Sequence, residues 1–215
     1  MKPLSACRLY TFVDTAYLHG HAPEEVARQL CDGGSGLIQL RAKNAPPDNV
    51  RRMAEAILPI IRAAGVRLVI NDHPAIAAEI GADLCHLGQE DFFDPGGYEL
   101  RYGSRATGIG LSTHAPEQAE RALAANPDYI AIGPVYATGT KPTARAVSLE
   151  YVRWAAANVS IPWFAIGGIN LDNLPAVLEA GAQRICVVSA ILNAPDIAAE
   201  CRKFRDVLER NGNLK

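Results

Sequence analysis

Two aspartates follow two short apolar runs in the first half of the chain. The runs Leu68–Ile70 and Leu84–Leu87 predict buried strands, and polar residues follow both at once, with Asp72 after the first run and Asp91 after the second. Carboxylate oxygens are ligands that Mg²⁺ prefers in proteins. If the strands are parallel neighbours, both carboxylates leave the sheet at one edge, which predicts a Mg²⁺ site. The alternative is that each aspartate caps the helix that follows its strand.

The segment between these runs predicts a helix. His73–Ile80 has Ala and Ile at helical spacing, and Gly81 can close the helix in a left-handed conformation. A strand, a helix and a second strand make a crossover unit with parallel strands, so Asp72 and Asp91 should converge. His86 lies inside an apolar run, which favours a buried, hydrogen-bonded imidazole over a metal ligand.

A set of polar and cationic residues lies at the end of the apolar run Leu37–Leu40. Gln39, Arg41 and Lys43 alternate with Leu40 and Ala42, so the three polar side chains share one face of an extended segment. Two cations that face a pocket would be costly without an anion to pair with them. The set therefore predicts an anionic substrate, and the alternative is a strand that simply ends in solvent.

Two later segments have the composition of phosphate-binding loops. Thr138–Lys141 combines hydroxyl groups, a glycine and a lysine, without the GxxxxGK[ST] spacing of a P-loop. Gly168 permits close approach of the backbone to a ligand, and Ser189 offers an N–H group and a hydroxyl to an oxyanion. One anion site rich in cations and another rich in backbone N–H groups predict two phosphorylated substrates, one of them a diphosphate that needs Mg²⁺.

Eight apolar segments alternate with helical segments to position these residues, which predicts a single-domain (β/α)8 TIM barrel over 1–215. An open, doubly wound sheet is the alternative, but no GxGxxG follows the first strand. Pro59 should bend the second helix or divide it. The predicted strands are 9–13, 37–40, 68–70, 84–87, 107–111, 129–132, 163–166 and 185–188. The predicted helices are 23–30, 49–64, 73–80, 95–102, 116–125, 149–157, 171–180 and 196–210.

The composition is that of a soluble globular protein. The 215 residues are 49% hydrophobic and 20% charged, and the formal net charge of −2 gives no electrostatic case for nucleic acid or membrane partners. The five cysteines are odd in number and widely spaced, which favours a reducing, cytoplasmic setting. No window is long and apolar enough for a membrane span. A homo-oligomer remains open.

Seven motifs, in this order along nearly the whole chain, resemble those of thiamine-phosphate synthases. They are QLRAK at 39–43, IND at 70–72, HLGQED at 86–91, GLSTH at 110–114, GPVYATGTK at 133–141, AIGGI at 165–169 and VVSAI at 187–191. The resemblance implies a (β/α)8 barrel and a transferase of thiamine biosynthesis. That enzyme joins hydroxymethylpyrimidine diphosphate to thiazole phosphate after pyrophosphate has left a pyrimidinylmethyl cation.

The resemblance also implies a role for each matching residue. Asp72 and Asp91 would bind Mg²⁺. The pyrimidine diphosphate would be held by Gln39, Arg41, Lys43, Asn71, Ser112 and Lys141, and Arg41, Lys43, Ser112 and Lys141 would be catalytic. The thiazole phosphate would contact Thr138, Thr140, Gly168, Val188 and Ser189. The substrate-binding prediction takes in Leu40, Ala42 and Gly139 within the same segments.

The sequence departs from the family pattern at two places, and two other functions compete with that of a synthase. The sequence PTARAVSLEYV after Lys141 lacks the Pro-x-Gly expected there, and His73 stands where the family commonly has Arg. The first rival is a TenI-like thiazole tautomerase of the same fold, which tends to lose the acidic pair and to carry His in place of Pro134. The second is a non-catalytic phosphate-binding barrel, against which the metal-binding set argues.

Overall fold

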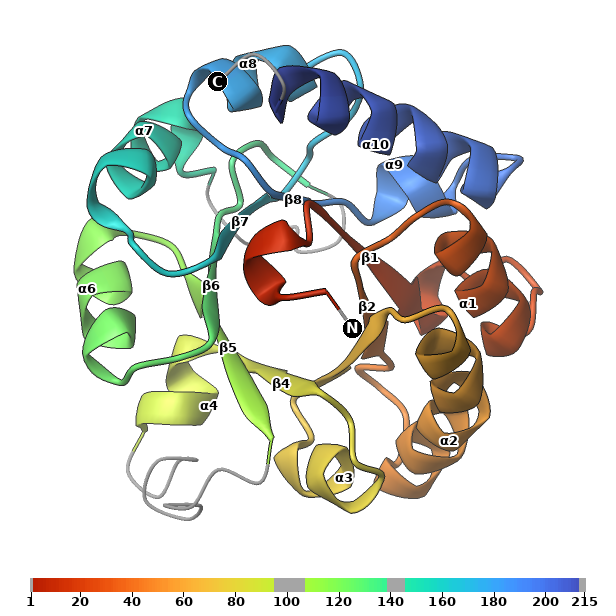
Figure 1. Cartoon of the computed structure of the whole chain (residues 1–215). Coiled ribbons are helices and arrows are strands. Elements are labelled where there is room, and N and C mark those ends of the chain that lie inside the picture. Colours follow the sequence, from red (N-terminus) through yellow and green to blue (C-terminus); the bar gives the residue numbers. More distant parts are fainter. Residues whose placement is uncertain (1, 95–106, 139–145, 213–215) are drawn as a thin grey trace.

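The computed structural model describes residues 2–94, 107–138 and 146–212, and these residues form one closed barrel (Figure 1). Each strand pairs in parallel with the next along the chain, and β1 pairs with β8 to close the ring. This confirms the predicted (β/α)8 TIM barrel and contradicts an open sheet. The strands are β1 Leu9–Asp14, β2 Leu37–Arg41, β3 Arg67–Asn71, β4 Leu84–Leu87, β5 Gly108–Thr113, β6 Tyr129–Ile132, β7 Trp163–Ile166 and β8 Ile185–Cys186.

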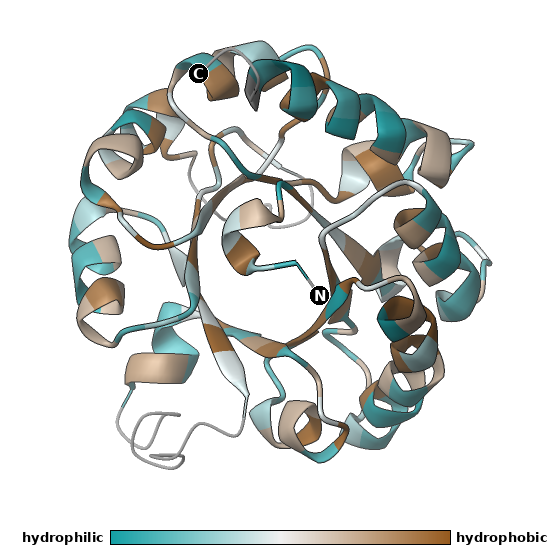
Figure 2. Cartoon of the chain, in the orientation of Figure 1, coloured by the Kyte–Doolittle hydropathy of each residue, from teal (hydrophilic) through white to brown (hydrophobic). Residues whose placement is uncertain are grey.

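The helices lie around the outside of the barrel (Figure 1). Figure 2 shows hydrophobic residues concentrated along the strands and hydrophilic residues on the outer turns of the helices, the pattern of a buried parallel sheet. The α-helices are α1 Pro23–Asp32, α2 Pro47–Ala63, α3 Pro74–Glu79, α4 Gln89–Phe93, α6 Pro116–Ala124, α7 Ser148–Asn158, α8 Leu174–Glu179, α9 Ser189–Leu192 and α10 Ile197–Gly212. Two short 3₁₀ helices, η1 Leu4–Ala6 and η2 Thr15–Tyr17, flank β1.

Local sequence explains most of the element boundaries. Pro residues occupy the first turn of α1, α2, α3, α6 and α8, where the missing N–H costs no hydrogen bond. Gly81 follows α3 with a φ of 68°, as predicted for a left-handed termination. Helix α2 runs on through the exposed Pro59 as one element, so the chain does not divide there.

Aromatic rings fill the centre of the barrel. Tyr10, Tyr129 and Phe164 lie edge to face with ring centroids 5.3–5.8 Å apart, and all three are fully buried. Such offset contacts are the favoured arrangement of aromatic pairs. The barrel interior is therefore packed with side chains, and any ligand must bind at one of its ends.

The amino ends of the strands are covered by η1. Figure 1 shows η1 over the centre of the ring. Arg67, at the start of β3, donates to the carbonyl of Lys2, and Arg184, just before β8, donates to the carbonyl of Ser5. The carboxyl ends are left to form a pocket. Among the described residues, no helix is both long enough and apolar enough to cross a membrane.

Several boundaries differ from the prediction. Strand β8 is two residues long, because the chain turns into α9 at Ser189. Helix α8 begins at Leu174 rather than 171, since the Asn170 side chain accepts hydrogen bonds from two backbone N–H groups and holds a turn there. Asp91 lies in the five-residue α4 rather than directly at a strand end. The helix predicted at 95–102 lies outside the described residues.

Candidate active site

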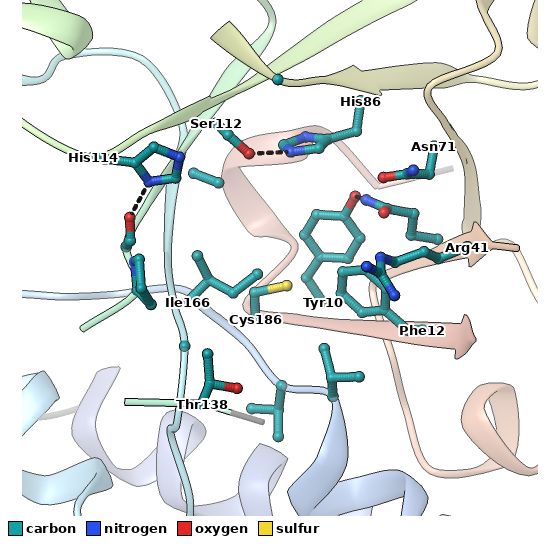
Figure 3. Close-up of a pocket in the computed structure, with 18 of the residues that line it drawn as sticks. Tyr10, Phe12, Arg41, Asn71, His86, Ser112, His114, Thr138, Ile166 and Cys186 are labelled. Atoms are coloured by element: carbon teal, nitrogen blue, oxygen red, sulfur yellow. Dashed lines mark hydrogen bonds between the residues drawn. The ribbon is translucent and has the colours of Figure 1, made fainter. Parts of the chain in front are cut away.

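A pocket opens at the carboxyl ends of the strands, where (β/α)8 enzymes place their active sites. Figure 3 shows the labelled side chains converging on it from β1, β2, β3, β4, β5, β7 and β8. The predicted site residues in its lining are Gln39, Arg41, Lys43, Asn71, Asp72, Asp91, Ser112, Thr138, Gly168, Val188 and Ser189. The structure therefore brings together residues that lie up to 150 positions apart in the sequence.

The end of β2 supplies the cationic side of the pocket. Gln39, Arg41 and Lys43 line the pocket, as strand alternation predicted. Leu40 and Ala42 do not, because alternation turns their side chains into the hydrophobic core. Both side chains are buried, and substrate binding by these two residues stays a prediction.

Arg41 has a buried partner that the sequence did not reveal. Its Nη1 donates to Oδ2 of Asp14 at 2.8 Å, and the two side chains are only 12% and 1% exposed. Asp14 Oδ1 accepts from the backbone N–H of Ala16 at 3.0 Å. The ion pair with Asp14 therefore holds the Arg41 guanidinium in place. The sequence did contain one indication of this role for Asp14. It lies two residues after Phe12 and four after Tyr10, which both line the pocket, so strand alternation places the three side chains on one face.

Asn71, Asp72 and Asp91 form the acidic side of the pocket. Asp72 has a φ of 61°, a left-handed conformation that is uncommon outside glycine and is often found at functional sites. The amide of Asn71 donates to Asp72 Oδ2 at 2.6 Å. Burial and then the negative charge of Asp91 raise the pKa of Asp72, whereas the Asn71 amide and Lys43 oppose that rise. The two aspartates therefore interact, as their convergence predicted.

This pair of carboxylates fits a hard cation. Neither caps a helix: the N-cap residues of α3 and α4 are His73 and Gly88, and neither cap has a side-chain hydrogen bond. A divalent cation would relieve the repulsion that raises the pKa of Asp72. Within the described ranges no cluster of three or more His, Cys, Asp or Glu side chains could hold a metal. Substrate and water oxygens could supply further ligands.

A buried polar chain crosses the floor of the pocket. His86 donates or accepts through both ring nitrogens, with Nε2 2.8 Å from Ser112 Oγ and Nδ1 2.9 Å from the hydroxyl of Tyr129. The prediction of a buried, hydrogen-bonded His86 is therefore confirmed. The Tyr129 hydroxyl also contacts that of Tyr10, which accepts a hydrogen bond from the Gln39 amide. The two tyrosines were not predicted, since no sequence signal marks which buried rings carry paired hydroxyls.

The opposite side of the pocket is built from backbone. Gly167 and Gly168 have φ values of 103° and 63°, and a Cβ on Gly168 would lie 2.7 Å from the carbonyl oxygen of Ala137. Asn173 donates to the Gly168 carbonyl at 2.9 Å and fixes this loop. Ser189 lies in the first turn of α9, so its N–H group is one that the helix leaves unpaired.

Some residues singled out in the sequence lie outside the described residues or outside the pocket lining. Thr138 lines the pocket, but Gly139, Thr140, Lys141 and most of the atypical loop after Lys141 lie outside the described residues. His73 does not line the pocket.

The chain matches known proteins over most of its length. Residues 9–191 match the family model described as thiamine monophosphate synthase. The thiamine-phosphate synthase of Thermus thermophilus is 48% identical over 177 residues, covering 82% of this chain and 84% of that protein. That of Deinococcus radiodurans is 43% identical over 202 residues, covering 90% of this chain and 71% of that protein.

A solved structure agrees with these sequence matches. Thiamine phosphate pyrophosphorylase from Pyrococcus furiosus superposes with a TM-score of 0.86 at 30% identity, covering 98% of this chain and 99% of that one. Fold, pocket position and sequence matches thus lead to one conclusion. The chain belongs to the thiamine monophosphate synthase family and is an enzyme of thiamine phosphate synthesis.

Proposed function

We propose that the enzyme joins hydroxymethylpyrimidine diphosphate to thiazole phosphate and releases pyrophosphate with the help of Mg²⁺ held by Asp72 and Asp91. The observation that supports this most is the contrast between the two sides of the pocket. Arg41 and Lys43 lie with the two aspartates on one side, whereas backbone of the Gly168 loop forms the other. A diphosphate with its cation fits the first side, and a monoester phosphate fits the second.

The described side chains can stabilise a leaving pyrophosphate. Arg41 is held in place by Asp14 before any substrate arrives, so its charge needs little reorganisation as negative charge develops. Lys43 is exposed at the pocket rim and can move to meet the diphosphate. When bound, Mg²⁺ would neutralise charge on the diphosphate oxygens.

The single thiol in the described lining of the pocket is not an activated nucleophile. The thiol of Cys186 faces the pocket, but burial raises its pKa well above the ordinary value and keeps it protonated (Figure 3). The stacked rings of Tyr10 and Phe12, with centroids 5.4 Å apart, give an apolar wall that excludes water. We propose that pyrophosphate leaves first and that the thiazole nitrogen then captures the cation, with the apolar wall limiting capture by water.

Pyrophosphate release in the presence of both substrates tests this proposal. We expect release that depends on both substrates, stops in EDTA and falls at least about 10²-fold in Asp91→Asn. Asp172→Asn is the matched control, because Asp172 is exposed and lies outside the pocket. Full activity in EDTA or in Asp91→Asn would overturn the metal assignment, and pyrophosphate release with both substrates present but without formation of the joined product would overturn the coupling reaction.

The thiazole tautomerase has less support. Pro134 lines the pocket at the position where that branch carries His, and proline has no group that could carry a proton. The acidic pair is also intact.

A further inference from the structure

Five side chains form a continuous hydrogen-bonded chain from β2 to β5 below the pocket. The Gln39 amide nitrogen donates to the Tyr10 hydroxyl, which lies 2.9 Å from the Tyr129 hydroxyl. That hydroxyl lies 2.9 Å from Nδ1 of His86, and Nε2 of His86 lies 2.8 Å from Ser112 Oγ, the last link being drawn in Figure 3. Gln39 and Ser112 both line the pocket, so the two ends of this polar chain face the ligand.

The backbone is shaped to allow the central link. His86, Gly110 and Tyr129 lie side by side in the register of β4, β5 and β6. A Cβ on Gly110 would lie 2.0 Å from Cζ of Tyr129, so the missing side chain makes room for the tyrosine ring. That ring then stacks on His86 with centroids 5.6 Å apart and an interplanar angle of 23°. Packing thus holds the two polar groups in contact.

The two tyrosine hydroxyls inside the polar chain carry one proton each. Tyr10 and Tyr129 are completely buried, and burial raises the pKa of both hydroxyls well above the ordinary value, so they stay protonated. Each hydroxyl therefore donates once. A neutral imidazole likewise donates from one nitrogen and accepts at the other.

These proton counts give the polar chain one direction. With Gln39 donating to Tyr10, the arrangement in which each tyrosine proton has an acceptor within the chain has Tyr10 donating to Tyr129 and Tyr129 donating to Nδ1 of His86. Nε2 of His86 then donates to Ser112 Oγ, which leaves the Ser112 hydroxyl proton for the pocket. Reversing either end requires all of the members to reverse together.

We propose that Tyr10, Tyr129 and His86 are positioning residues that couple the hydrogen-bonding characters of Gln39 and Ser112. The amide oxygen at one end accepts, and the hydroxyl at the other end donates. This inference rests on the proposed function for its ligand: an aminopyrimidine offers an amino group that donates and ring nitrogens that accept. Gln39 and Ser112 would therefore recognise the amino group and a ring nitrogen of the same ligand together.

The first test compares two substrates. One is the 4-aminopyrimidine diphosphate, and the other is its 4-oxo counterpart, in which a carbonyl replaces the amino group and a ring nitrogen carries a proton. We expect the wild type to prefer the amino form by at least about 10²-fold in kcat/KM, since mispaired buried groups are strongly rejected. Tyr129→Phe cuts the chain, so its ends can turn independently and the preference should fall by about 10-fold or more.

Tyr151→Phe is the matched control. The Tyr151 hydroxyl is also buried and makes two hydrogen bonds, to Thr113 Oγ1 at 2.8 Å and to the carbonyl of Ala115 at 2.9 Å, but it does not belong to the polar chain. This variant should keep the wild-type preference. If Tyr129→Phe does not fold, Tyr10→Phe cuts the neighbouring link and should lower the preference in the same way.

The second test needs no activity. In protein labelled with ¹⁵N-histidine, we expect His86 to carry its proton on Nε2, with the signal assigned by its loss in His86→Asn. A proton on Nδ1 would overturn the direction of the chain. Normal pyrophosphate release with an unchanged preference in Tyr129→Phe would overturn the coupling. Absence of release from the wild type would instead contradict the proposed function, while the tautomer would still test the chain.

Discussion

At the scale of single residues, the site contains charged side chains that form ion pairs with each other in the absence of substrate. Arg41 and Asp14 illustrate this, because both are nearly buried and each is the other's partner. Strand alternation could predict that Arg41 faces the pocket, but the pairing depends on the register of β1 against β2, in which Asp14 lies beside Arg41. Spacing from Tyr10 and Phe12 could place Asp14 on their face of the strand, but the register that pairs it with Arg41 could not be read from this sequence, and the partner was missed for that reason.

Asp14→Asn should lower the free energy of unfolding by about 3 kcal/mol, because it leaves a buried guanidinium without its counter-ion. Pyrophosphate should restore more stability to this variant than to the wild type, since an anion replaces the lost partner. Denaturant unfolding with and without pyrophosphate measures both effects. Asp83→Asn is the control: Asp83 also accepts a backbone N–H and faces an arginine, Arg67, but lies away from the pocket. An equal response to pyrophosphate in both variants would contradict the prediction.

The raised pKa of Asp72 predicts how Mg²⁺ should stabilise the protein as pH changes. A pKa above the unfolded value means that ionised Asp72 costs stability, and this cost builds up as pH rises from the unfolded-state pKa to the raised folded-state pKa. Mg²⁺ should offset that cost, so the rise in Tm caused by Mg²⁺ should be larger near pH 7 than near pH 4. Asp72→Asn should abolish this pH dependence. A Tm shift that is the same at both pH values would argue against the site.

At the scale of elements, compact apolar runs predicted the strands better than the sequence predicted the shortest helices. The bounds of β4, β6 and β7 agree with the predicted strands because each is a compact apolar run. The five-residue α4 and four-residue α9 are too short to show a helical period, so Asp91 and Ser189 were expected at strand ends. The chemistry expected of these residues did not depend on that difference.

The glycine loop after β7 should be more sensitive to substitution than an equivalent glycine elsewhere. Gly168 and Gly65 have similar φ values of 63° and 69°, so an alanine at either should cost about 1 kcal/mol of stability for the backbone alone. Gly65 has open space around it, whereas a Cβ on Gly168 would crowd Ala137 and Tyr136. Gly168→Ala should therefore also raise KM for thiazole phosphate with little change in pyrophosphate affinity. Equal kinetics in the two variants would contradict a phosphate site at this loop.

At the scale of the whole molecule, the two ends of the barrel have separate tasks. The carboxyl ends of the strands carry the polar and charged lining of the pocket, while the amino ends are covered by η1 and its contacts with arginines. The alternation of strands and helices in the sequence predicted the barrel and hence the end that holds the site. It could not predict that the first residues of the chain cover the other end. The cytoplasmic location and a homo-oligomer stay predictions.

This separation predicts that deleting the residues before Cys7 should reduce stability without altering catalysis. Arg67 and Arg184 would lose the carbonyl groups of Lys2 and Ser5, which should lower the free energy of unfolding by roughly 1–3 kcal/mol. The pocket lies at the far end of a packed barrel, so kcat/KM for pyrophosphate release should stay within about twofold of wild type at temperatures where the truncated chain is folded. Denaturant unfolding and initial rates on the same preparations measure the two quantities. Arg184→Met removes one of these contacts and should give part of the stability loss with the same unchanged rate. A truncated chain that is folded but slow would show that η1 acts on the site through the barrel core.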